Sequence, residues 1–196
     1  MIYFLSDAHF LHKGIMRHCP WRQRWPDVNA MNEGIIKIWN DSIKPEDTVY
    51  FLGDLALGKP SKLKKIIPRL NGHKIMVLGN HDLGRQFYLD NGFERVYDSR
   101  TAVAIGGRIV DVSHYPFKPG FFKQLYYHIF DRKMLRELGK HPIDEGQILI
   151  HGHVHSRWGY RGRMINAGLD AHVGPNGDPK ILSEHMILNY LDTFSL

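Results

Sequence analysis

Short apolar runs that stop abruptly at glycine or at polar residues recur along this chain of 196 residues. The clearest are residues 49–52 and 75–78, which run into Gly53 and Gly79. Apolar, β-rich runs of about four to eight residues with such boundaries indicate buried strands. Similar patterns predict further strands at residues 2–5, 93–97, 101–105, 108–112, 147–150 and 163–166.

Other segments carry apolar residues at helical spacing. Met31, Ile35, Ile38 and Trp39 recur at the i, i+4, i+7, i+8 positions of one buried stripe, which predicts a helix over residues 29–40. Shorter helices are expected at 61–67, 85–91, 132–138 and 183–192. The glycine pair at 106–107 predicts a hairpin turn between two strands.

The order of these elements indicates the class of fold. Strands and helices alternate in the first half of the chain, and antiparallel strands enter in the second. That order favours a mixed α/β sandwich. The length of 196 residues fits one domain with one sizeable core, so we expect a single domain over 1–196.

The composition is that of soluble globular proteins, with 43% apolar and 23% charged residues. No apolar run approaches the length of a membrane span, so no membrane association is expected. Cys19 is the single cysteine, which excludes an internal disulfide and agrees with a reducing compartment. The chain enters a strand at once, without a basic leader, and a cytoplasmic location is therefore expected.

The net charge narrows the choice of partners. A charge of +6 and a pI near 9.4 favour anionic partners, such as phosphate esters, nucleotides or nucleic acid. A basic surface that serves only solubility explains the same charge equally well.

Polar residues with metal-binding side chains follow five of the predicted strands. Because ligands of open α/β sheets bind at the carboxyl ends of the strands, these side chains are expected at one rim. They supply oxygen and imidazole donors without a thiolate, which suits Mn, Fe, Zn, Co or Ni. Each one alone could equally be a structural residue. The set consists of Asp7, His9, Asp54, Asn80, His114, His153 and His155.

Cations mixed with aromatic residues form a second group of candidates. Arginines of the loop 17–28 and of the segment 157–163 could hold a substrate phosphate through a guanidinium fork. For the first loop, arginines stacked on Trp21 or Trp25 are the alternative. The stretch 115–140 could clamp nucleotides, but we favour a packed cap or an oligomer contact. The candidates for phosphate binding are Arg22, Arg24, Lys59, Arg157 and Arg161.

Five motifs, in this order, carry a resemblance to a known family. They are Asp7-x-His9, Gly53-Asp54, Gly79-Asn-His-Asp82, Ser113-His114 and Gly152-His-x-His155. In this order the chain resembles the calcineurin-like metallophosphoesterases, and its N-terminal part is similar to small bacterial and phage members. The resemblance implies a four-layer αββα sandwich, with two mixed β-sheets flanked by helices in a single domain.

The resemblance also implies two divalent metal ions, with Mn²⁺ the first choice and Fe, Zn, Ni or Co as alternatives. One would be held by Asp7, His9, Asp54 and His155, and the second by Asp54, Asn80, His114 and His153. Asp54 would bridge them.

In the family, a hydroxide shared by the two ions attacks phosphorus in line with the leaving group. The resemblance places His81 beside the leaving group as general acid or electrostatic stabiliser, and gives Asp82 the task of orienting the His81 ring. His151 falls outside the ligand pattern and is expected at the wall of the site.

The sequence therefore predicts a metal-dependent phosphoric ester hydrolase that acts on phosphodiesters or phosphomonoesters, nucleotide-like ones first. The residues that follow Asp54, from Leu55 to Gly58, lack the arginine typical of protein Ser/Thr phosphatases, which argues against that branch. A nuclease or RNA-end phosphatase is the alternative, with nucleic acid as the partner. A binding module with the same fold but without catalysis is a third hypothesis. The sequence specifies no oligomeric state.

Overall fold

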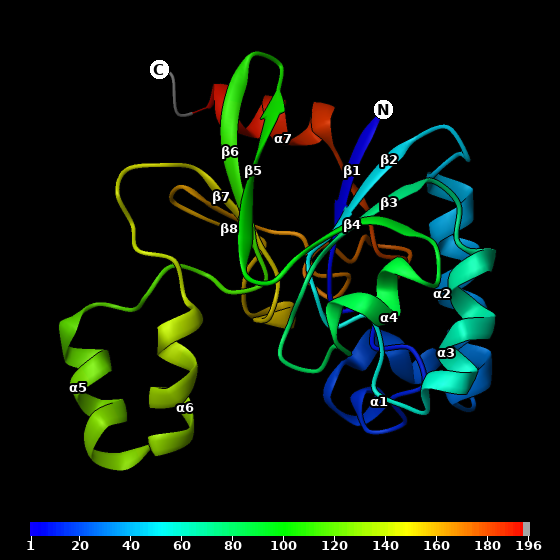
Figure 1. Cartoon of the computed structure of the whole chain (residues 1–196), viewed down its shortest axis with the longest axis horizontal. Coiled ribbons are helices and arrows are strands. Elements are labelled where there is room, and N and C mark those ends of the chain that lie inside the picture. The colour runs from blue at the N-terminus through cyan, green and yellow to red at the C-terminus, as the bar shows by residue number, and fades with distance from the viewer. Residues whose placement is uncertain (194–196) are drawn as a thin grey trace.

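We describe the protein from a computed structural model, which covers residues 1–193. Two five-stranded β-sheets form its centre (Figure 1). The first sheet has the order β10-β1-β2-β3-β4, with β1 to β4 parallel and β10 antiparallel to β1. Its strands are β1 (Ile2–Leu5), β2 (Thr48–Phe51), β3 (His73–Val77), β4 (Phe93–Tyr97) and β10 (Leu182–Ser183).

The second sheet has the order β5-β6-β7-β9-β8 and is also mixed. Strands β6, β7 and β9 are parallel, while β5 and β8 run antiparallel to their neighbours. Both glycines of the predicted hairpin turn between β5 and β6 have positive φ, 53° at Gly106 and 77° at Gly107. The strands are β5 (Arg100–Ile105), β6 (Arg108–Ser113), β7 (Leu149–His151), β8 (Tyr160–Arg161) and β9 (Met164–Asn166).

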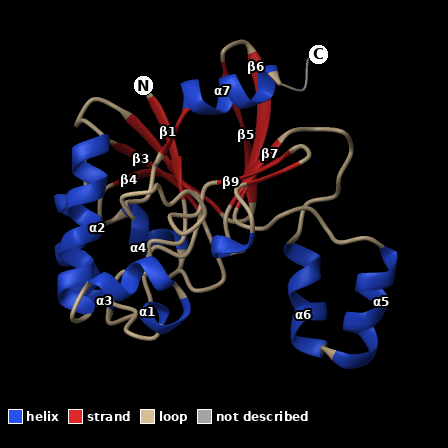
Figure 2. Cartoon of the chain, turned by 180° about the vertical axis from the view of Figure 1, so that it is seen from behind, coloured by secondary structure: helices blue, strands red, loops and turns tan. Residues whose placement is uncertain are grey.

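The helices flank this pair of sheets (Figure 2). Helices α2, α3 and α4 lie along the first sheet, and α7 lies across the end of the sandwich. A hairpin of α5 and α6 stands off to the side of the second sheet. The helices are α1 (Ile15–His18), α2 (Val28–Ser42), α3 (Pro60–Ile66), α4 (Arg85–Leu89), α5 (Phe121–Phe130), α6 (Arg132–Glu137) and α7 (Glu184–Asp192).

Two apolar cores lie on the two faces of the first sheet. Leu5 and Phe51 point to the core that the sheet shares with α2, α3 and α4. Phe4 and Leu52, one residue away, belong to the core between the two sheets. Because successive side chains of a strand face opposite ways, a strand with both faces covered must be apolar throughout. This explains the unbroken apolar runs in the sequence.

The structure confirms the predicted fold class, two mixed sheets flanked by helices, and finds each predicted strand and helix to within a few residues. Four of these helices and strands were not predicted. Helix α1 is only four residues long, helix α5 lies in the stretch that we interpreted from its aromatic content alone, and β8 and β10 are strands of two residues. Such short strands exist only through their partners, so no local pattern identifies them.

The carboxyl ends of the two sheets are joined by hydrogen bonds between loops. Ser6 N, just beyond β1, donates to Ala167 O beyond β9 at 3.0 Å. Ala167 N donates to His151 O at the end of β7, and Gly152 N donates to His114 O beyond β6. Strand ends of both sheets therefore meet along one line, and their polar residues face the same space.

No helix within residues 1–193 is both long enough and apolar enough to cross a bilayer.

Candidate metal centre

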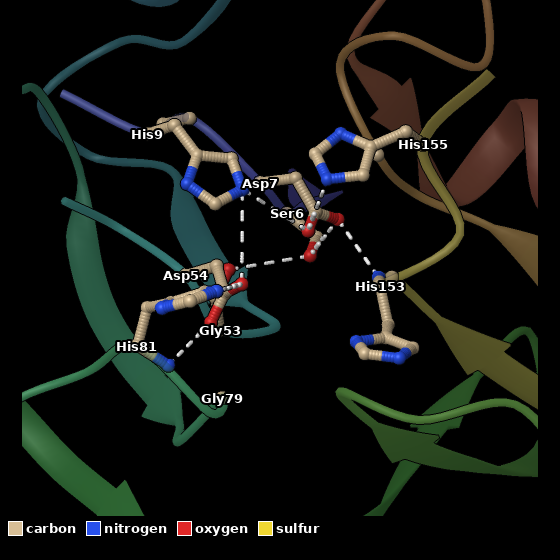
Figure 3. Close-up of polar contacts among 12 residues, drawn as sticks. Ser6, Asp7, His9, Gly53, Asp54, Gly79, His81, His153 and His155 are labelled. Carbon is tan, nitrogen blue, oxygen red and sulfur yellow. Dashed lines mark hydrogen bonds and ion pairs between the residues drawn. The ribbon is translucent and has the colours of Figure 1, made fainter. Parts of the chain in front are cut away.

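The residues that follow β1, β2, β3, β6 and β7 converge at this junction of the sheets (Figure 3). Asp7 N donates to Gly53 O at 3.0 Å, and His9 N donates to Asp54 O at 3.1 Å. These two bonds tie the loop after β1 to the loop after β2. All seven side chains predicted as ligands lie in this one region, in two groups that meet at Asp54.

The backbone of the candidate ligands is unusual. Six residues other than glycine have positive φ among residues 1–193, and five of them are predicted ligands. Positive φ costs a residue with a side chain about 1 kcal/mol or more, and such positions cluster at functional sites. These loops therefore hold their side chains in place at a cost in backbone strain. The five are Asp7 at 59°, His9 at 49°, Asp54 at 59°, His153 at 71° and His155 at 48°.

The first group of donor atoms surrounds Asp7. His9 Nε2 lies 3.8 Å from Asp7 Oδ1 and 3.7 Å from Asp54 Oδ2. His155 Nε2 lies 3.9 Å from Asp7 Oδ1. Donor atoms that each lie about 2 Å from one metal ion are themselves about 3 to 4 Å apart. The spacing of this group is therefore that of a shared ion.

The second group lies on the other side of Asp54. His114 Nε2 is 3.7 Å from Asp54 Oδ1 and 3.1 Å from Asn80 Oδ1. His153 Nδ1 is 3.1 Å from Asn80 Oδ1 and 3.2 Å from His114 Nε2. His114 Nδ1 lies 2.8 Å from Leu52 O, so Nδ1 carries the proton and donates to it. Nε2 of His114 is left free to act as a ligand.

Asp54 is the carboxylate that the two groups share. Its Oδ2 faces His9 and its Oδ1 faces His114. The residue is 2% exposed, and burial raises its pKa to about 6 against the opposing effect of His114. The raised pKa shows that the buried surroundings disfavour the ionised carboxylate. Positive charge close to both oxygens would stabilise it.

Three donor atoms of the first group have no hydrogen-bond partner within residues 1–193, and they show whether this group fits a metal ion. They are Asp7 Oδ1 and both ring nitrogens of His9, and all three are buried. Buried polar atoms are normally paired, so these atoms call for a ligand. Burial lowers the pKa of His9 to about 2, which leaves a neutral imidazole with a lone pair to give. Nitrogen and oxygen donors of this kind fit divalent transition metals.

Two hydrogen bonds to Oδ2, one from a side chain and one from the backbone, hold Asp7 so that only Oδ1 faces the site. Ser6 Oγ lies 2.6 Å from Asp7 Oδ2, and His153 N donates to the same oxygen at 2.9 Å. Room for this arrangement depends on Gly152, where an added Cβ would lie 1.9 Å from Ser6 Oγ. The glycine of the last motif is therefore required by close contact.

His155 is oriented by Asp170, which sequence reasoning missed. Its Nδ1 lies 2.6 Å from Asp170 Oδ2 and donates to it, so Nε2 faces Asp7. Burial opposes a charge on His155, but the bond to Asp170 raises its pKa to about 10, so a metal ion that binds at Nε2 must displace a proton from the ring. Carboxylates that hold ligand histidines in this way are common in metal sites. The signal for Asp170 was its position just beyond the predicted strand 163–166.

Arg22 holds Asp170 rather than a substrate, contrary to our expectation. It is 0% exposed, and its Nε donates to Asp170 Oδ1 at 2.7 Å. Its terminal nitrogens donate to Asp7 O at 2.7 Å and Ala8 O at 2.8 Å. These bonds occupy the N–H donors of the buried guanidinium, so Arg22 cannot bind a substrate phosphate as well. It braces the loop after β1 instead.

Two of the three remaining candidate arginines differ in their position relative to the site. Arg24 is at the surface, where it pairs with Asp178 and lies over the ring of Trp25 at 5.8 Å. This is the stacked alternative. A cleft opens at the candidate metal centre, and Arg24 is not among the residues that line it. Arg157 does line the cleft, together with His153 and His155.

His81 lies at the mouth of the site. Its backbone N donates to Asp54 Oδ1 at 3.0 Å, and its ring Nε2 lies 4.0 Å from Asp54 Oδ2. The His81 side chain is 42% exposed and lines a cleft of 530 Å³. It is therefore within reach of a molecule in the cleft. Figure 3 shows its ring beside Asp54 and apart from His153.

Asp82 does not orient the ring of His81 as we expected. Its Oδ2 accepts hydrogen bonds from the backbone N of Asp54 and of Gly79, both at 2.7 Å. Its Oδ1 accepts from the hydroxyl of buried Tyr88 at 2.7 Å. Backbone groups of two adjacent loops satisfy this carboxylate, so its role is to hold the loops after β2 and β3 together.

His151 is fully buried at the end of β7, where its Nδ1 lies 2.7 Å from Gly152 O. Burial lowers its pKa to about 4. It lies behind the loop that carries His153 and His155 and is not among the residues that line the cleft, so its place at the wall of the site stays a prediction.

Comparison with known proteins identifies the family. The family model of the calcineurin-like phosphoesterases (Metallophos) matches residues 1–163. The chain belongs to this family. The resemblance based on the five motifs is thereby confirmed, and family membership supports the prediction of a metal-dependent phosphoesterase.

Similar proteins come from archaea, bacteria and phages. An uncharacterized protein of Methanocaldococcus jannaschii is 40% identical over 89 residues, which span 44% of this chain and 49% of that protein, about half its length. The gene 66 protein of Mycobacterium phage D29 is 30% identical over 190 residues, 87% of this chain and 88% of that protein. A solved structure from Aquifex aeolicus, a protein of unknown function, is 29% identical with a TM-score of 0.63 and covers 97% of this chain and 98% of its own.

Proposed function

We propose that this protein hydrolyses phosphate esters with two divalent metal ions. The observation that carries the proposal is the pair of donor groups that share Asp54. Asp7, His9, Asp54 and His155 would hold one ion, and Asp54, Asn80, His114 and His153 the other. Bound there, two divalent ions would make a water acidic enough to ionise near neutral pH and would offset charge on the phosphoryl oxygens.

The chain itself supplies a group for the leaving oxygen. His81 faces the cleft at its mouth, close to Asp54 but outside the buried donor groups. From there its ring can reach the oxygen of a leaving alcohol and donate a proton to it or stabilise its charge. Arg157 lines the same cleft, and its guanidinium suits a phosphate oxygen. Asp82 contributes by keeping Asp54 and the Gly79 loop in register.

The substrates we propose are phosphodiesters or phosphomonoesters of nucleotide type. The net charge of +6 supports an anionic substrate. The same charge supports the alternative of a nuclease or RNA-end phosphatase, which predicts an affinity for nucleic acid that falls steeply as salt rises. Mn²⁺ is our first choice of metal, with Fe, Zn, Ni and Co compatible with the donors, and a cytoplasmic location stays a prediction.

The test is hydrolysis of bis-p-nitrophenyl phosphate and p-nitrophenyl phosphate by the purified protein in the presence of Mn²⁺. His81→Ala should lower kcat at least ~10²-fold, because it removes a group that acts on the leaving oxygen. His185→Ala, at an exposed position of α7, is the matched control and should leave the rate unchanged.

Two results would contradict the proposal. One is a wild-type protein that hydrolyses neither ester with any of the five metals. The other is a rate with His81→Ala equal to that of the parent, which would show that His81 takes no part in the reaction.

A further inference from the structure

A second cavity opens beside the metal centre, next to His153 of the second donor group. Its volume is 320 Å³, and it shares His153, Val154 and Arg157 with the cleft described above. Its walls come from the loop after β6, from the start of the segment after α6, and from the loop between β7 and β9. A molecule bound at the metal centre can therefore extend into this cavity.

The walls carry more positive than negative charge. Lys118, Arg157 and Arg161 line the cavity, and Asp144 is the carboxylate among the lining residues. Asp144 already accepts a hydrogen bond from Arg163 at 2.8 Å, so its charge is offset. The cavity is thus suited to an anionic group.

The same walls offer flat surfaces for an aromatic ring. Phe117 and Trp158 line the cavity, and the guanidinium of Arg161 lies over the Trp158 ring at 5.1 Å. Nucleobases stack both on aromatic side chains and on guanidinium planes. Arg161 is exposed, so its plane is accessible to a ligand.

Two lining residues also have polar atoms without partners. His141 is 8% exposed, and its Nδ1 lies 2.9 Å from Pro116 O and donates to it, which leaves Nε2 as an acceptor. That Nε2 and the indole Nε1 of Trp158 are buried and have no hydrogen-bond partner within the described part of the chain. One acceptor and one donor in the residues that line the cavity are thus unpaired, and buried polar atoms normally have a partner.

We propose that this cavity binds the nucleoside part of a small nucleotide substrate, with the base against Arg161 and Trp158. The inference rests on the proposed function, because the scissile phosphate would lie at the metal centre while the base occupies the cavity. Arg157, which lines both the cavity and the cleft at the metal centre, would then face the phosphate side. The volume of 320 Å³ is at the lower end of the range of about 300–1,000 Å³ for small-molecule sites. It suits one nucleotide rather than a strand of nucleic acid.

Binding of adenosine monophosphate and of ribose 5-phosphate, measured by titration calorimetry, tests the proposal. The two probes share the phosphate and the sugar, so the difference in Kd isolates the base. We expect adenosine monophosphate to bind about tenfold tighter or more, as stacking of one base provides. Arg161→Gln should reduce this preference to less than about threefold. Arg108→Gln, a surface arginine paired with Asp192 and outside the cavity, is the matched control and should keep it.

Equal affinities of the wild type for the two probes would overturn the proposal, and so would a preference that survives Arg161→Gln. Binding of an oligonucleotide without binding of adenosine monophosphate would also overturn it. These results are separate from the test of the proposed function. A protein that hydrolyses bis-p-nitrophenyl phosphate but shows no preference for the base keeps its function and loses the nucleotide cavity. A protein that prefers the base but hydrolyses no ester does the reverse.

Discussion

At the scale of single residues, the site has two features. Several candidate ligands have a strained backbone, and glycines stand where neighbouring atoms leave no room for a side chain. The candidate ligands with positive φ occupy the turns directly after strands. Gly79 illustrates the second feature, because a Cβ at this position would lie 2.3 Å from Asp54 Oδ1 and 2.7 Å from Asp54 N. Gly79 therefore serves the position of Asp54 rather than flexibility.

Gly79→Ala should displace Asp54 and lower the rate of ester hydrolysis at least ~10²-fold, since displacements of about 1 Å near reacting groups have effects of that size. The rate with bis-p-nitrophenyl phosphate and the metal content per chain are the measurements. Gly84→Ala is the matched control, because an added Cβ there meets nothing within 4 Å. Equal rates for the two variants would contradict this role of Gly79.

Arg22 and Arg24 stand two positions apart in one loop and have opposite environments. Arg22→Met leaves the carboxylate of Asp170 buried without its arginine and should lower the free energy of unfolding by about 3–5 kcal/mol. Arg24→Met breaks a surface pair with Asp178 and should cost about 1 kcal/mol or less. Urea denaturation of both variants measures the difference. A smaller effect for Arg22→Met than for Arg24→Met would refute the assignment.

At the scale of elements, the strand ends could be predicted from the sequence because the cause is local. A run of apolar residues with both faces buried, followed by Gly53 or Gly79, identifies both the strand and the point where it ends. The ion pair between Arg22 and Asp170 could not be predicted, because the two residues are 148 positions apart in sequence and meet only in the folded chain. The partner of Asp82 could not be predicted for the same reason. The resemblance suggested the ring of the adjacent His81, whereas the structure shows the backbone N of Asp54.

Helix α2 shows how far the periodic pattern reaches. Met31, Ile35 and Trp39 are buried as expected, whereas Ile38 is half-buried and Ile36 takes a place in the core. The helical period was read correctly, but its buried face is turned slightly from the predicted stripe.

Trp39 anchors α2 to the first sheet. It is 0% exposed, its ring stacks on Phe51 at 5.8 Å, and its Nε1 donates to Asn71 O at 3.0 Å. Trp39→Ala should lower the free energy of unfolding by about 3–5 kcal/mol. Lys37→Ala, exposed on the same helix, should change it by less than about 0.5 kcal/mol. Chemical denaturation compares the two, and similar midpoints would contradict the packing described for α2.

At the scale of the whole molecule, the candidate site belongs to neither sheet alone. Asp7, His9, Asp54 and Asn80 come from the first sheet, and the three remaining histidines come from the second. The hydrogen bonds from Ser6 to Ala167 and from Ala167 to His151 hold the two sets of loops together. Glu137, the last residue of α6, lines the cleft. A role of the α5–α6 hairpin as a cap over the site stays a prediction.

The number of metal ions per chain tests the central claim most directly. The protein is saturated with Mn²⁺, freed of unbound metal, and analysed by plasma mass spectrometry. The two donor groups predict two ions for the parent and for Asp41→Ala, an exposed control on α2, and fewer than two for Asp54→Ala. One ion or none in the parent, or two ions retained by Asp54→Ala, would contradict a pair of metal sites that share this carboxylate.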